Sequence, residues 1–234
     1  MQLPLYSFKK PANRPFIYAS FVSTLDGKII VKEPGYWPIG TANDYEFFTH
    51  LRAHADVIVD GKNTALMFGH KTIETIQSDF FKQIRKNLGK ESPVEYVVVT
   101  SKPNASLLAQ FDRGYKPYIA TLHSSQHSGY DRSKIIAISG QTHINLSKLM
   151  SEFEKRNWHY VFVDGGPTLI LALLAENLLD ELFITLAPKI FGSKQGKTMT
   201  LAEGQLFPPE DIKKFKLISS EVVGDEVFLR YQIQ

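Results

Sequence analysis

Two kinds of hydrophobic pattern alternate along the chain. Short runs of β-branched and aromatic residues are typical of strands buried on both faces, whereas apolar residues that recur every three or four positions are typical of amphipathic helices. The runs predict strands at Phe16 to Val22, Asp56 to Asp60, Tyr96 to Thr100, Tyr118 to Thr121, Ile135 to Ile138 and Val161 to Val163. This alternation of strands and helices indicates a single α/β sheet.

Helices are predicted between these strands. Thr41 and Asp44 form a start signal for the first helix, which runs to about Ala55. Apolar residues at helical spacing predict one further helix over residues 73–84, another over 146–153, and an apolar one that ends near residue 177.

The C-terminal part differs in character. Apolar and polar residues alternate from Leu182 to Ala187, and Gly224-Asp225 stands between two strand-like runs, where that pair suits a type II′ hairpin. The expected fold class is therefore α/β, with a mixed, mostly parallel sheet closed by antiparallel strands. Since the chain shows no internal repeat or linker, residues 1–234 are expected to form a single domain.

Composition narrows the functional classes. The 234 residues carry a formal net charge of only +3 without a long basic run, which argues against nucleic acid as a partner. The chain has no cysteine, and its seven histidines show no ligand pattern, so no metal site is expected. No apolar run is long enough to span a bilayer or to serve as a signal peptide, and we therefore expect a cytoplasmic protein with no membrane partner.

The strongest local signal for chemistry follows a buried strand. Asp164, Gly165, Gly166, Pro167 and Thr168 come directly after Val161 to Val163. The glycines permit close approach to the backbone, Pro167 fits the first position of a helix, and a helix start offers unpaired N–H groups. This geometry suits a dinucleotide pyrophosphate, although a tight strand-to-helix turn without a ligand has the same sequence.

Two further strand ends repeat the arrangement. Gly61, Asn63 and Thr64 follow one strand, and Thr100, Ser101 and Lys102 follow another. Turns at the carboxyl ends of parallel strands face one crevice, where open α/β sheets bind ligands. The hydroxyl and ammonium groups of the second turn suit the 2′-phosphate of NADPH. Ordinary solvated loops are the alternative for both.

Residues 192–198 look like a P-loop but have only three residues between the two glycines, where that motif needs four. Nucleotide hydrolysis is therefore not expected.

Several segments occur in the order and spacing of a known family. They are Arg14 to Phe16, Ser23 to Lys28, His50 to Ala53, Asp56 to Thr64, Val161 to Thr168, Leu179 to Leu182 and Ala187 to Gly192. Together they resemble the reductase domain of the riboflavin-biosynthesis deaminase–reductases and their stand-alone relatives, over most of the chain.

The resemblance implies a dihydrofolate-reductase-like, three-layer fold with helices on both faces of the sheet. It also implies NADPH as hydride donor, a homodimer, and reduction of the ribosyl group of a 5-amino-6-(5-phosphoribosylamino)pyrimidine, such as the uracil, to ribityl. The cofactor supplies the hydride, and the protein supplies position and charge. The chain lacks the zinc signature of a deaminase.

Site residues follow from the resemblance by position. It implies that Lys28 contacts the substrate and that Asp164 lies near the reacting sugar. The cofactor-facing positions are Gly61, Asn63, Thr64, Gly165, Gly166, Pro167 and Thr168. The segment that resembles a substrate-side loop contains Trp37, Ile39, Gly40 and Thr41.

The chain departs from the family pattern at two places. Asp164 stands where family members usually have Glu, which shortens the reach of the carboxylate. After Thr64, the Asp and Arg that hold the substrate's ribose and phosphate in many members are missing. Either other groups hold the phosphate or the substrate is different. Two alternatives therefore stay open: a reductase of the same fold acting on another carbonyl, imine or pterin-like substrate, and a nucleotide-binding protein without catalysis.

Overall fold

The computed structural model describes residues 5–35, 37–111, 114–123 and 129–234. Its strands are β1 (Phe16–Thr24), β2 (Ile30–Val31), β3 (Val57–Gly61), β4 (Glu95–Val99), β5 (Tyr118–Leu122), β6 (Ile135–Ile138), β7 (Tyr160–Gly165), β8 (Glu181–Ala187), β9 (Thr198–Met199), β10 (Phe215–Val223) and β11 (Glu226–Ile233). Its helices are α1 (Ala42–His54), α2 (Lys62–Gln77), α3 (Asp79–Asn87), α4 (Ala105–Gln110), α5 (Leu146–Lys155) and α6 (Pro167–Ala175).

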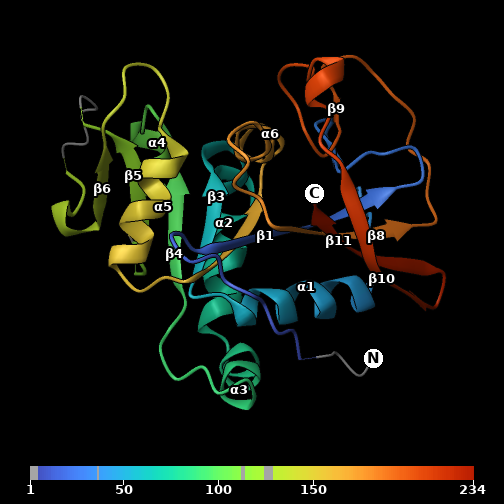
Figure 1. The fold of residues 1–234 in the computed structure, drawn as a ribbon, viewed down its shortest axis with the longest axis horizontal. Coiled ribbons are helices and arrows are strands. Elements are labelled where there is room, and N and C mark those ends of the chain that lie inside the picture. Colours follow the sequence, from blue (N-terminus) through green and yellow to red (C-terminus); the bar gives the residue numbers. More distant parts are fainter. Residues whose placement is uncertain (1–4, 36, 112–113, 124–128) are drawn as a thin grey trace.

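Among the described residues, nine strands form one sheet in the order β10-β11-β8-β1-β7-β3-β4-β5-β6 (Figure 1). The pairings from β8 through to β6 are parallel, whereas β11 runs antiparallel to both β8 and β10. The predicted mixed, mostly parallel sheet with a C-terminal antiparallel hairpin is confirmed. The hairpin turns at Gly224, whose φ of +61° is the value that the first turn position of type II′ requires.

Helices cover both faces of this sheet. One core packs side chains of β1, β3, β4 and β7, such as Tyr18 and Phe162, against α1, α2, α3 and α4. The other packs the alternate residues of the same strands, such as Ile17 and Val161, against α5 and α6. Since successive residues of a strand point to opposite faces, one apolar run supplies both cores. No helix of the described chain is long and apolar enough to cross a membrane.

The helical region after β3 differs from the sequence prediction. The predicted single helix over residues 73–84 is wrong, because two helices, α2 and α3, meet at Ser78. Ser78 ends α2 and caps α3, since its Oγ accepts a hydrogen bond from the Phe81 amide at 3.2 Å. Helix α2 also begins earlier than expected, at Lys62, so the residues after Thr64 are helical.

Candidate active site

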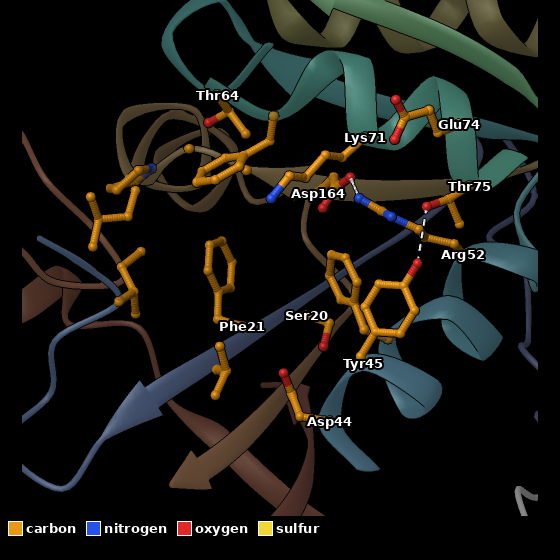
Figure 2. Close-up of a pocket in the computed structure, with 18 of the residues that line it drawn as sticks. Ser20, Phe21, Asp44, Tyr45, Arg52, Thr64, Lys71, Glu74, Thr75 and Asp164 are labelled. Atoms are coloured by element: carbon orange, nitrogen blue, oxygen red, sulfur yellow. Dashed lines mark hydrogen bonds and ion pairs between the residues drawn. The ribbon is translucent and has the colours of Figure 1, made fainter. Parts of the chain in front are cut away.

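A cavity of about 550 Å³ opens at the carboxyl ends of β1 and β7. Residues of helices α1 and α2 form part of its wall (Figure 2). Its polar and charged lining residues are Ser20, Asp44, Tyr45, Arg52, Thr64, Lys71, Glu74, Thr75, Ser78 and Asp164. Apolar side chains, including Phe21, Phe48 and Phe68, form much of the remaining wall.

A second cavity of about 380 Å³ adjoins the first. The two share Ile30, Thr64, Gly166 and Pro167 in their linings. The second is lined by eight of the residues that the sequence analysis assigned to the cofactor: Gly61, Asn63, Thr64, Thr100, Ser101, Gly166, Pro167 and Thr168. Gly165 lines the first cavity. Lys102 lines neither cavity, and the lysines that do line the second are Lys32 and Lys62.

The two glycine turns meet where the cavities join. Asp60 pairs with Gly165 across β3 and β7, and a Cβ built on Gly61 would lie 3.6 Å from the nitrogen of Gly166. The peptide bond between Gly165 and Gly166 is cis. Gly61 and Gly166 are the N-cap residues of α2 and α6, and neither helix start has a side-chain cap. Two sets of unpaired helix amides therefore lie side by side, an arrangement suited to an anionic ligand.

The Thr64 side chain packs against both glycines of the Gly165-Gly166 turn. A Cβ added to Gly166 would lie 2.8 Å from the Thr64 hydroxyl, so any larger residue would displace it. Packing against Thr64 therefore favours glycine at position 166.

Asp164 lies in the first cavity as half of a buried ion pair. Arg52 of α1 donates to its Oδ2, and only 7% and 6% of the two side chains are exposed. The same guanidinium donates to Thr72 and lies 4.2 Å from the centre of the Phe48 ring. Asp164 is neither the cap nor part of helix α6, which begins after Gly166. Its carboxylate therefore depends on Arg52 for its charge balance.

A second carboxyl lies beneath this pair. Asp60 is fully buried, and the Tyr96 hydroxyl donates to its Oδ2 at 2.6 Å, whereas its Oδ1 has no partner among the described residues. Burial raises the pKa of Asp60 well above its usual range, and the negative charge of Asp164 raises it further. Both effects favour the protonated form of Asp60 beneath the Arg52–Asp164 pair.

A third carboxyl, that of Asp44, lies at the other end of the cavity. Burial raises the pKa of Asp44 to about 6, the charge of Glu226 adds to this effect, and the Thr185 hydroxyl partly opposes it. The carboxyl is still ionised at neutral pH. Figure 2 shows Asp44 and Ser20 at one end of the cavity, with Lys71 and Asp164 at the opposite end.

Lys28 lies outside the residues that line the two cavities. Its Nζ donates to the Asp26 carbonyl at 2.8 Å, and the residue is only 8% exposed. To contact a substrate in the first cavity, its side chain would have to leave this bond.

The predicted substrate-side residues Trp37, Ile39, Gly40 and Thr41 also lie outside both linings. Lys189 holds the backbone of this segment, donating to the Ile39 carbonyl at 2.7 Å. Thr41 caps α1, as the start signal predicts, and it is bonded in turn to Glu226. The segment leads directly into Asp44, which does line the cavity.

Three candidate residues on helices, Arg52, Asp44 and Lys71, are not predicted from the sequence. Arg52 belongs to the His50 to Ala53 segment, which is one of the segments that resemble the family. That resemblance is the feature of the sequence that could have indicated a role for Arg52. The sequence pattern explains Asp44 as part of a helix start, and Lys71 follows the stretch where the expected Asp and Arg are missing. Among the described residues, no cluster of His, Cys, Asp or Glu side chains could hold a metal ion.

Comparisons with known proteins fit this architecture. A curated relative, the 2,5-diamino-6-ribosylamino-4(3H)-pyrimidinone 5′-phosphate reductase of Archaeoglobus fulgidus, is 26% identical over 216 residues, which cover 91% of this chain and 95% of the relative. Among solved structures, RibD of Acinetobacter baumannii matches with a TM-score of 0.69 at 17% identity, over 95% of this chain and 59% of that one.

The dihydrofolate-reductase-like fold is confirmed as well. Dihydrofolate reductase of Enterococcus faecalis, solved in complex with NADP(H), matches with a TM-score of 0.51 at 14% identity, over 94% of this chain and 96% of that one. The family model described as the RibD C-terminal domain matches residues 15–229. With that match spanning nearly the whole sequence, the chain belongs to the RibD C-terminal domain family.

Proposed function

We propose that this chain is an NADPH-dependent reductase that converts the ribosyl group of a 5-amino-6-(5-phosphoribosylamino)pyrimidine to ribityl in riboflavin biosynthesis. The observation that carries the proposal is the junction of two cavities at Gly166, where two uncapped helix starts meet beside the Asp164 carboxylate. The relative from Archaeoglobus fulgidus is named as a reductase of a ribosylaminopyrimidinone 5′-phosphate, and this supports the choice of substrate.

The residues of the second cavity fit a nicotinamide dinucleotide. Amides at the starts of α2 and α6 suit the pyrophosphate, and Gly61 leaves room for it because it has no side chain. Lys32 and Lys62 line the same cavity and form no hydrogen bond or ion pair with another described side chain, so their charges are available for the 2′-phosphate of NADPH. The hydroxyls of Thr100 and Ser101 support the same assignment.

The first cavity fits the substrate. Its volume, about 550 Å³, lies within the range of about 300–1,000 Å³ usual for small-ligand sites. Lys71 projects into it from α2 and has no partner among the described residues, which makes it the natural group for the 5′-phosphate (Figure 2). In this proposal Lys71 binds the substrate's phosphate in place of the Arg that the chain lacks.

NADPH, when bound, would supply the hydride that reaches C1′ of the opened, imine-like sugar. The chain's own contribution is electrostatic and positional. Asp164, fixed by Arg52, presents a carboxylate that stabilises the imine in its protonated, iminium form. Hydride addition at C1′ then gives the neutral amine, so the two hydrogens gained are the hydride and the proton already on nitrogen. Apolar side chains, including Phe21 and Phe48, form the wall beside the place proposed for the reacting atoms. A contact between Lys28 and the substrate remains a prediction, because its ammonium is bonded to its own turn.

A direct assay tests the proposal. NADPH oxidation is followed by absorbance after addition of the pyrimidine ribosyl phosphate, and the product is checked by mass spectrometry for two added hydrogen atoms. Oxidation dependent on both components is expected. Binding of NADPH without oxidation would favour another substrate or a non-catalytic role, and failure to bind either NADPH or NADH would overturn the assignment.

We further propose a homodimer. The edge strand β10 exposes Leu217, Ile218 and Val222, at 49%, 42% and 70% of their surfaces. An exposed apolar edge strand is suited to pairing with a second copy. Light scattering after size exclusion should give twice the mass of the chain, and Val222→Lys should shift it to the monomer. A cytoplasmic location without nucleic-acid or membrane partners stays a prediction.

A further inference from the structure

The Asp44 carboxylate occupies the position where a helix-capping acid is normally found. It is the third residue after Thr41, and an acid there usually bonds the backbone N–H of the cap residue. In this chain the Thr41 N–H donates instead to Glu226 Oε1 at 3.0 Å, and the Thr41 hydroxyl donates to Glu226 Oε2 at 2.5 Å. The start of α1 is thus capped without Asp44.

The surroundings hold the Asp44 carboxyl in the cavity. A Cβ built on Gly40 would overlap its Oδ2, so only glycine at position 40 leaves room for the carboxyl in this place. The Thr185 hydroxyl is near enough to lower the pKa of Asp44, but no regular hydrogen bond joins them, since Thr185 Oγ1 is a buried atom without a partner among the described residues. The acid is therefore ionised, partly buried and incompletely satisfied.

Ser20 provides a second unsatisfied polar group at the same end. It lies on β1, is only 3% exposed, lines the cavity, and makes no side-chain hydrogen bond to any described residue. Figure 2 shows its hydroxyl and the Asp44 carboxyl pointing toward the same space. Both groups face the cavity and are available to a ligand that enters it and completes their hydrogen bonds.

We propose that Asp44 recognises the edge of the substrate's pyrimidine ring and selects a 2-amino-4-oxopyrimidine over the corresponding uracil. This inference rests on the function proposed above. Along its edge, the 2-amino-4-oxopyrimidine presents two adjacent donors, the 2-amino group and N3–H, followed by the C4 carbonyl. A carboxylate accepts both donors, as it does from the planar fork of a guanidinium, and the Ser20 hydroxyl can donate to the carbonyl.

Uracil fits the same groups poorly. Its C2 carbonyl replaces the amino group, so one carboxylate oxygen would face another oxygen instead of a donor. A site built to bond a substrate N–H rejects an analogue that lacks it, because its own buried polar group is left unpaired. The discrimination expected at an ionised Asp44 is at least about 100-fold.

The proposed phosphate site at Lys71 agrees with a pyrimidine ring that is bound at Asp44. Lys71 lies at the opposite end of the cavity from Asp44, with Phe21 between the two ends (Figure 2). A ring held at Asp44 would direct the ribosyl phosphate toward Asp164 and Lys71. Since hydrolytic deamination is the reaction that turns the 2-amino ring into the uracil, a hydrolytic deaminase must act on the product of this enzyme and not supply its substrate.

The test compares kcat/KM for the two ribosylaminopyrimidine phosphates, the 2,5-diamino-4-oxo compound and the 5-amino-uracil compound, with NADPH in excess. The protein should prefer the diamino compound by about 100-fold or more. Asp44→Asn should reverse or abolish this preference, because an amide offers one acceptor to N3–H and one donor to the C2 carbonyl. Glu74→Gln is the matched control: it removes a carboxylate at the Lys71 end, and the ratio should stay unchanged.

The outcomes separate this inference from the proposed function. If neither compound oxidises NADPH, the proposed function itself fails. If both are reduced equally, or the uracil is preferred, the function stands and the role of Asp44 is refuted. An Asn variant that keeps the preference of the unmodified protein refutes it as well, and circular dichroism of that variant verifies that it is folded.

Discussion

Replacing Asp44 with Asn should stabilise the folded protein. The two side chains have nearly the same shape, so the contact with Gly40 is kept while the buried charge is removed. Burial raises the pKa of Asp44 from its usual 3.8 to about 6, which means that the folded state disfavours the ionised carboxyl. At 1.36 kcal/mol per pH unit, this difference corresponds to about 3 kcal/mol of stability lost at neutral pH.

The effect has a definite pH window. A carboxyl whose pKa is raised on folding destabilises the protein above that raised pKa and has no effect below the unfolded value. The loss in the free energy of unfolding therefore reaches its full value of about 3 kcal/mol above about pH 6. It falls to about 1 kcal/mol near pH 4.5 and vanishes below about pH 3.8. Asn carries no charge at any pH, so the gain from the substitution should follow this curve.

Urea unfolding measured at about pH 7.5 and pH 4.5 provides the assay. The Asn variant should gain up to about 3 kcal/mol in the free energy of unfolding at the higher pH and roughly 2 kcal/mol less at the lower one. Glu74→Gln, at an exposed carboxylate, should change stability little at either pH. A loss of stability at Asp44→Asn, or a gain that does not depend on pH, would refute the account of Asp44 as a strained, ionised group.

Three further predictions concern the charged groups of the two cavities. Lys62→Ala should weaken NADPH binding about 10-fold while leaving NADH binding unchanged, as measured by fluorescence titration. Lys71→Ala should raise KM for the phosphorylated substrate about 10-fold or more but should hardly affect the dephosphorylated nucleoside, which locates the phosphate. Asp164→Asn leaves Arg52 buried without its counter-ion, so urea unfolding should show a loss of about 3–5 kcal/mol, whereas a loss below about 1 kcal/mol would show that the pair is solvated.

Much of the sheet is predictable because its strands are locally distinct. A run such as Tyr96 to Val99 is buried on both faces, so its pattern does not depend on distant partners. The helices near α2 are harder to predict. Apolar residues continue at helical spacing through Ser78, and the break there depends on one hydroxyl that caps the next helix. Periodicity alone contains no information about that hydrogen bond.

The residues of the candidate site also fall into a group that the sequence predicts and a group that it does not. Glycines at strand ends are visible in the sequence because the backbone itself provides the binding groups, and most residues predicted for the cofactor do line the second cavity. Asp44 was not predicted as a site residue, because its position after Thr41 has a sufficient local explanation as a helix start. In the structure Glu226, which lies 185 residues away from Thr41 along the chain, accepts the hydrogen bond from the Thr41 amide, so Asp44 is not needed to cap the helix.

The capping of α1 by Glu226 in place of Asp44 also explains what the residues of the predicted substrate-side segment do. Ile39 is held by Lys189, Thr41 is held by Glu226, and Gly40 has no side chain where the Asp44 carboxyl packs. None of the three lines the cavity, yet each fixes the start of α1 and thereby the place of Asp44. Their contribution to the site is to position a carboxylate, and sequence spacing alone cannot distinguish a residue that binds a ligand from one that positions its neighbour.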